Sequence, residues 1–145
     1  KCFSAPTSCS AHKDTAMEWC HLERFSFGDS VALADELAAL VLAGLKTATC
    51  WAASDGMLTE VGKRMVMLDG SGVPRAVIET LELAQKRFDE VDAAFAYDEG
   101  EDDRSLASWL QEHRRYFTGK GQFAEDMRLC CEHFRVVERI TDPDR

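Results

Sequence analysis

A lysine followed by two threonines is the group of residues best suited to chemistry in this chain. Lys46, Thr47 and Thr49 come directly after Gly44. A lysine changes its pKa readily when it is partly buried, and a nearby hydroxyl then completes a base and nucleophile pair. The alternative is structural: a glycine that ends a helix, a cation that complements the helix dipole, and a threonine-rich strand. Both interpretations place the lysine directly after a helix.

A carboxylate in the second half of the chain is predicted to join this lysine. Under the two-residue period of a β-strand, Glu79 shares a face with Val77, Leu81 and Leu83. A carboxylate among apolar neighbours needs a cation or several donors, or it must be protonated. Lys46 is the available cation, so the sequence predicts a buried pair between it and Glu79. The alternative is an edge strand whose face is partly wet.

The elements that must position these residues follow from hydrophobic periodicity and from capping residues. A helix over residues 31–43, capped at Asp29 or Ser30, precedes a strand over residues 47–52. The turn at residues 69–72 joins a strand over 64–68 to a strand over 74–83. The remaining predicted elements are a strand within 22–27, a helix capped by Asp92 and ended by Gly100, a helix over 105–117 and a strand within 127–140.

Length and composition describe one globular domain. The chain has 145 residues, of which 46% are hydrophobic and 30% are charged, and this is enough for a single core. No apolar run approaches the roughly twenty residues of a membrane-spanning helix, and no secretory signal is recognisable. We therefore expect a cytoplasmic protein without a membrane partner. The expected organisation is a poorly ordered extension over residues 1–21, one domain over 22–140 and a tail over 141–145.

The charge of the chain limits its partners. A net charge of −9 argues against tight, sequence-independent binding of long nucleic acids, because that affinity comes from neutralising phosphates. Arg114, Arg115 and Lys120 form a candidate patch for a nucleotide or a short single strand, and the alternative is a solvated helix face. The acidic run over residues 98–103 is interpreted as a solvated loop rather than a cation site.

Six cysteines stand at positions 2, 9, 20, 50, 130 and 131, without a Cys-x-x-Cys pair. In the absence of a secretory signal, we expect most of them to be reduced thiols. The set of Cys9, His12, Cys20 and His21 matches no standard zinc-finger spacing. No metal site and no cofactor are therefore predicted.

The segment Gly44-Leu45-Lys46-Thr47-Ala48-Thr49 resembles the Gly-x-Lys-x-x-Thr signature of the ASCH-domain family, a branch of the PUA-like superfamily. The chain is similar to the bacterial branch of about this length. One departure is Trp51, where the family often has an arginine. The similarity covers roughly residues 22–138 and continues in order through residues 33–37, 61–62, 77–80, 88–91, 100–106, Trp109, His113, Phe117 and 131–137.

The resemblance implies an α+β fold, with a small PUA-like β-barrel of about five to six strands and helices covering its openings. It also implies a cleft beside the Gly-x-Lys loop that binds a nucleoside, a nucleotide or an RNA base. Some relatives resemble amide hydrolases acting on N4-acylated cytidine, and others resemble single-strand ribonucleases. In the first case the matching catalytic positions are Lys46, Thr49 and Glu79.

We therefore predict a hydrolase of an amide on a modified nucleoside, in which Glu79 holds Lys46, Lys46 takes the proton of Thr49, and Thr49 attacks the amide carbonyl. One alternative is a single-strand RNA-binding module or ribonuclease without amidase activity, with Trp51 or Trp109 stacking on a base. Another is a scaffold in which the ion pair is purely structural. The predicted ligand-binding residues are Gly44, Thr47, Trp51, Arg104, Trp109, His113 and Arg114.

Overall fold

The computed structural model describes residues 2–4 and 19–141. The strands of this part are Cys2–Ser4 (β1), Arg24–Ser26 (β2), Ala48–Ala52 (β3), Arg64–Leu68 (β4), Pro74–Arg87 (β5) and Arg128–Arg139 (β6). Its α-helices are Val31–Leu42 (α1), Ala93–Glu99 (α2) and Leu106–Gly119 (α3), and short 3-10 turns lie at Ala53–Asp55 and Phe88–Glu90.

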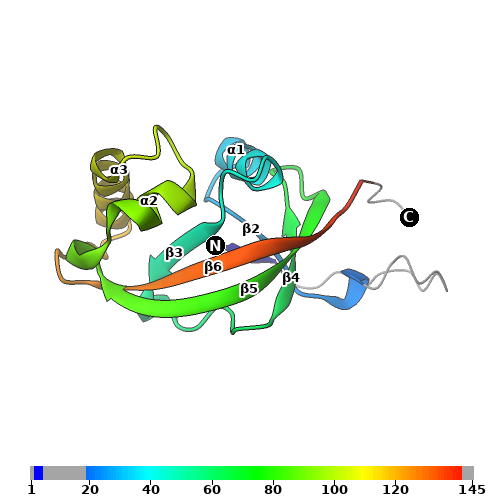
Figure 1. The fold of residues 1–145 in the computed structure, drawn as a ribbon, viewed down its shortest axis with the longest axis horizontal. Helices are drawn as coiled ribbons and strands as arrows, with labels where there is room; N and C mark the ends of the chain where they lie inside the picture. The colour runs from blue at the N-terminus through cyan, green and yellow to red at the C-terminus, as the bar shows by residue number, and fades with distance from the viewer. Residues whose placement is uncertain (1, 5–18, 142–145) are drawn as a thin grey trace.

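The six strands form one mixed sheet in the order β1-β2-β4-β5-β6-β3 (Figure 1). Strands β2 and β4 are parallel, and the other neighbouring strands are antiparallel. The long strands β5 and β6 curve across the molecule, with the helices placed over the sheet. The predicted α+β class is confirmed.

Side-chain caps begin the helices where the sequence predicts them. The Ser30 hydroxyl accepts a hydrogen bond from the Leu33 amide at 3.2 Å, and Asp92 accepts one from the Phe95 amide at 2.9 Å. Gly100 ends α2 in the left-handed conformation, with φ at 72°, which a residue without a Cβ adopts at little cost. The predicted elements are confirmed in kind and order, although β5 is longer than the predicted strand.

The helices cover two different hydrophobic clusters. Helix α1 packs on a cluster that includes Phe25, Phe27, Met65, Ile78 and Phe134. Helices α2 and α3 pack on a second cluster that includes Ala48, Ala52, Leu129 and Cys131 from β3 and β6. The loop from α1 to β3 therefore connects the first cluster to the second, and it carries Lys46.

Parts of the predicted poorly ordered extension belong to the domain. Strand β1 pairs with β2, while Trp19 and Cys20 are buried in a third cluster with Val66 and Val77. The expectation is wrong for these segments because burying an indole ring against the sheet stabilises the chain there. Residues 1, 5–18 and 142–145, which include Cys9 and His12, lie outside the described residues.

Cysteine chemistry differs between the two ends of the described chain. Cys50, Cys130 and Cys131 are free, as expected. Cys20 is disulfide-bonded and is thus an exception within the prediction that most of the cysteines are reduced thiols. None of the helices within residues 2–4 and 19–141 combines the length and apolar character that crossing a membrane requires.

Gly100→Ala is expected to destabilise the protein by about 1–3 kcal/mol. The added Cβ would collide with the Leu45 carbonyl, and the backbone is left-handed, with φ at +72°. Gly119→Ala is the matched control, because nothing lies within 4 Å of a Cβ there. The control should be neutral or stabilising by up to about 1 kcal/mol. Denaturant unfolding measures both variants, and equal losses would contradict this account of the α2 end.

Candidate active site

Lys46 lies in the loop between α1 and β3, where Gly44 turns the chain with φ at 77°. The lysine is only 2% exposed. Its ammonium donates to the carbonyls of Ala48 at 2.9 Å and Glu99 at 3.4 Å, and to Oε2 of Glu101 at 3.0 Å. Oε1 of Glu99 lies 4.0 Å away. These three hydrogen bonds use all three protons of the ammonium.

The charge state of Lys46 follows from these partners. Burial alone would lower the pKa of Lys46, but the carboxylates of Glu101 and Glu99 outweigh it and hold the pKa above its ordinary value. The side chain is therefore an ammonium at neutral pH. The predicted role of Lys46 as the base for Thr49 is not available in this state, because a base first needs a free lone pair.

Glu99 is the carboxylate at the centre of the cluster. It is the last residue of α2 and is only 1% exposed. The Trp109 indole N–H donates to its Oε2, and Nε2 of His113 lies 3.2 Å from the same oxygen. Burial alone would raise the pKa of Glu99, but Lys46 and His113 lower it to about 2. The C-terminal end of a helix carries a partial negative charge and so disfavours a carboxylate. Lys46 and His113 are therefore needed to keep Glu99 ionised.

An imidazole and a thiol border this carboxylate. The His113 ring stacks on Trp109 with 4.0 Å between ring centroids, and its Nδ1 lies 2.9 Å from the Trp109 carbonyl oxygen. Burial lowers the pKa of His113, but the charge of Glu99 more than offsets this and the pKa lies above its ordinary value. Burial, reinforced by Glu99, raises the pKa of the Cys50 thiol well above its usual range. We call Lys46, Cys50, Glu99, Glu101 and His113 the Lys46 cluster.

The predicted pair between Glu79 and Lys46 is wrong. Glu79 lies opposite Arg64 of β4 and Arg135 of β6. It accepts hydrogen bonds from these arginines at 3.3 Å and 2.9 Å. Register shifts on either side of Glu79 interrupt the pairing of β5 with β6, so the simple two-residue period does not decide which side chains are buried. The carboxylates that hold Lys46 are Glu99 and Glu101 instead.

Thr49 is buried in β3, with 5% of its surface exposed, and strand alternation places it on the face opposite to Cys50. Its cross-strand neighbour is the fully buried Glu132, which accepts a hydrogen bond from the Thr80 hydroxyl at 2.7 Å.

The Lys46 ammonium lies 5.3 Å from the ring centroid of Phe27, a member of the hydrophobic cluster under α1. Lys46 therefore contacts both hydrophobic clusters.

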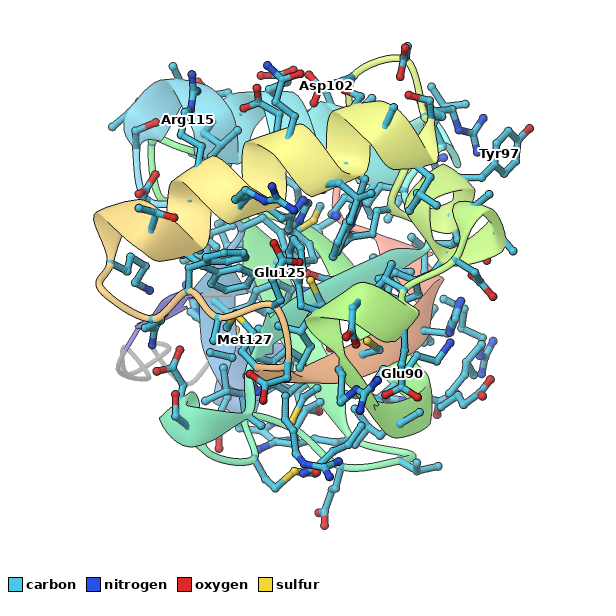
Figure 2. The ribbon with its side chains drawn as sticks, turned by 90° about the vertical axis from the view of Figure 1, so that its left-hand side faces the viewer. Glu90, Tyr97, Asp102, Arg115, Glu125 and Met127 are labelled. Carbon is cyan, nitrogen blue, oxygen red and sulfur yellow. The ribbon has the colours of Figure 1, made fainter. Side chains whose placement is uncertain are left out.

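Two predicted ligand-binding residues fasten the lysine loop to α2. The amide and hydroxyl of Thr47 donate to the Asp98 carbonyl at 2.8 Å and 3.3 Å. Arg104 donates to the carbonyls of Tyr97 and Leu45 at 3.0 Å and 3.3 Å. Its guanidinium lies 3.5 Å from the Tyr97 ring centroid, and Figure 2 shows Tyr97 at the outer edge of α2. These bonds hold the Lys46 loop against the segment that supplies its carboxylates.

Trp51 and Arg114 make their contacts elsewhere, whereas Trp109 and His113 belong around Glu99. Trp51 is buried and donates to the Gly56 carbonyl at 2.9 Å. Arg114 pairs with Glu125 at 2.9 Å, and Figure 2 shows Glu125 on the segment that follows α3. Both residues thus have structural partners in this arrangement.

Sequence reasoning missed Glu99, Glu101 and Cys50. A local signal for Glu99 exists, because it directly precedes Gly100, the residue expected to end a helix. The prediction of a solvated loop for the acidic run is wrong for Glu99, which is buried. No comparable signal marks Cys50, which is brought to Glu99 only by the packing of α2 on β3.

The fold is that of an ASCH domain, and the chain belongs to the ASCH domain family, whose sequence model matches residues 23–138. The ASCH domain from Lactobacillus crispatus JV V101 is 35% identical, with a TM-score of 0.73 and 79% of each chain covered. Protein EF3133 from Enterococcus faecalis V583 is 33% identical, with a TM-score of 0.73, covering 81% of this chain and 77% of that one.

A more distant structure shares the fold alone. The ASCH protein from Zymomonas mobilis is 16% identical, with a TM-score of 0.53, and the alignment covers 72% of this chain and 64% of that one. None of the curated proteins compared with the chain matches it.

Stability is expected to fall as the pH drops from about 4.5 toward about 2, because the depressed pKa of Glu99 stabilises the fold only while the carboxylate is ionised. The raised pKa of His113 has the opposite sign. The stabilisation that comes from protonated His113 is fully present below the pKa of this residue in the unfolded state. It is lost as the pH rises through the pKa in the folded state. Glu99→Gln should flatten both limbs of the curve of unfolding free energy against pH.

The control for this measurement is Glu60→Gln, which removes an exposed carboxylate. Urea unfolding at a series of pH values compares the two variants with the parent protein. An acid limb that is unchanged by Glu99→Gln would show that Glu99 is not the ionised partner of Lys46.

Proposed function

We propose that this ASCH domain hydrolyses an amide on a modified nucleoside of the N4-acylated cytidine type at the Lys46 cluster. The proposal rests on the buried ammonium of Lys46, which lies beside Glu99 and the partly exposed Glu101. Buried ion networks with shifted pKa values are frequent at functional sites. A fixed ammonium is suited to stabilise the negative charge that develops on an acyl oxygen under attack.

The roles in this proposal differ from those expected from the sequence. Thr49 is buried on the face of β3 opposite to Cys50, so a water molecule takes the role first given to its hydroxyl, and the water oxygen bonds to the acyl carbon while Lys46 stabilises the oxyanion. Glu101 takes the role first given to Glu79, because its side chain is 26% exposed and lies 3.0 Å from the ammonium. It accepts a proton from the attacking water and passes it to the leaving amine as the carbon–nitrogen bond breaks. The products are the carboxylic acid and the free amine.

The local charge favours an uncharged nucleoside over a polyanion. Residues 98–103 carry five carboxylates, and two of them contact Lys46. Figure 2 shows Asp102 on the loop that leads into α3. A phosphate backbone approaching this loop would meet like charge, whereas a neutral base with an acyl group would not.

The arginines of α3 give less support to the alternative, binding or cleavage of single-stranded RNA. Arg114 pairs with Glu125 at 2.9 Å, and Arg115 pairs with Glu112 at 3.2 Å. A phosphate would have to displace a carboxylate from each arginine. Salt-sensitive binding of a short single strand, without hydrolysis of any acylated nucleoside, would favour this alternative.

The proposal predicts release of acetate and cytidine from N4-acetylcytidine by the purified protein. Lys46→Met and Glu101→Gln should each lower kcat/KM by about 100-fold or more, since each removes a group that acts in the transition state. Lys63→Met is the matched control, because Lys63 makes a more exposed ion pair with Glu23, and it should leave the rate unchanged.

Product formation is followed by chromatography, and circular dichroism verifies that each variant is folded. Equal rates for Lys46→Met and Lys63→Met would rule out a role for the Lys46 cluster. The absence of hydrolysis over a panel of acylated nucleosides would rule out the reaction itself.

A further inference from the structure

Three metal-ligating side chains from different elements meet next to Lys46. Cys50 comes from β3, Glu99 from the end of α2 and His113 from α3. The Cys50 sulfur, a Glu99 carboxylate oxygen and a His113 ring nitrogen all lie within 4.8 Å of one another. The sequence gives no hint of this group, because its members are separated by other elements.

The orientation of His113 leaves one ring nitrogen for an ion. Its Nδ1 lies 2.9 Å from the Trp109 carbonyl oxygen, and a carbonyl only accepts, so Nδ1 carries the hydrogen. The other nitrogen, Nε2, lies 3.2 Å from Oε2 of Glu99. Two lone pairs facing each other at that distance repel, so either a proton or a metal ion must lie between them. A metal-binding histidine typically donates its other N–H to a carbonyl in this manner.

The surrounding residues fix the ligands in place. The Trp109 indole donates to the Glu99 carboxylate and stacks on the His113 ring, with 4.0 Å between centroids. His113 and Cys50 are only partly buried. The site thus has ligands held in place by supporting hydrogen bonds, as a functional metal site requires.

We propose that Cys50, Glu99 and His113 bind a divalent transition-metal cation of the zinc type. Sulfur, nitrogen and oxygen donors together suit Zn²⁺, whose bond lengths of about 2.0–2.3 Å place tetrahedral ligands about 3.5 Å apart. From the present spacing of up to 4.8 Å, the three side chains need to close by little more than about 1 Å.

The consequence of three protein ligands is an open coordination position. Zinc sites with three protein ligands and one water are typical of catalysis rather than structure. The two charges of the ion are offset by the Cys50 thiolate and the Glu99 carboxylate, and Glu101 still pairs with Lys46. The inference goes beyond the proposed amide hydrolysis, because metal binding is measured without any nucleoside.

The test is titration of the untagged full chain with Co²⁺ and, in competition with a chromogenic chelator, with Zn²⁺. We expect one ion per chain and thiolate-to-cobalt charge-transfer absorption in the near ultraviolet. Cys50→Ser should abolish that absorption, and both Cys50→Ser and His113→Gln should weaken Zn²⁺ binding by about 100-fold or more. Cys130→Ser is the matched control, because this buried free thiol is not one of the three ligands.

Tryptophan fluorescence supplies a second readout, since Trp109, one of the three tryptophans, contacts both Glu99 and His113. Binding that is the same in Cys50→Ser and Cys130→Ser, or no binding in the parent protein, would overturn the proposal. If a variant fails to fold, the parent still decides: Co²⁺ binding without thiolate absorption contradicts Cys50 as a ligand.

Discussion

A buried lysine ammonium is the constraint on which this part of the structure depends. Lys46 has almost no exposed surface, so its charge has to be balanced by carboxylates within reach of the α1–β3 loop. The end of α2 supplies them, and backbone bonds from Thr47 to Asp98 and the close approach of Gly100 to Leu45 fix the two loops together. Because Glu99 also bonds to Trp109 and lies beside His113, the same carboxylate links the lysine loop to α3.

The charge distribution of this network also limits the chemistry. Lys46 is a cation without a free lone pair, so its charge is suited to stabilise an anion rather than to remove a proton. Glu101 is the partner of Lys46 with the most exposed side chain, and in the proposed reaction it is therefore the group that the substrate would displace or use. On the far side of β3, Thr49 lies opposite the buried Glu132. The side chains of Thr49 and Cys50 thus lie on opposite faces of strand β3, and Lys46 lies in the loop just before this strand.

The sequence predicts the elements well because the signals for them are local. The caps at Ser30 and Asp92 and the helix-ending Gly100 lie within a few residues of the structure they specify. The partner of Lys46 is not a local property. Glu79 is not this partner, because two arginines on neighbouring strands pair with it. The register shifts of β5 cannot be predicted from a two-residue period. Glu99 lies fifty-three residues from Lys46, and only the packing of α2 beside β3 brings them together.

The most direct test of the central claim is a double-mutant cycle between Lys46 and Glu99, measured by denaturant unfolding of the parent, Lys46→Met, Glu99→Gln and the double variant. The account predicts a loss of about 3–5 kcal/mol for Lys46→Met, because it leaves buried carboxylates without their cation. It also predicts that the double variant loses at least about 1 kcal/mol less than the sum of the single losses. Additive losses, each well below about 1 kcal/mol, would instead be those of an exposed pair and would contradict a buried ion network at the centre of the site.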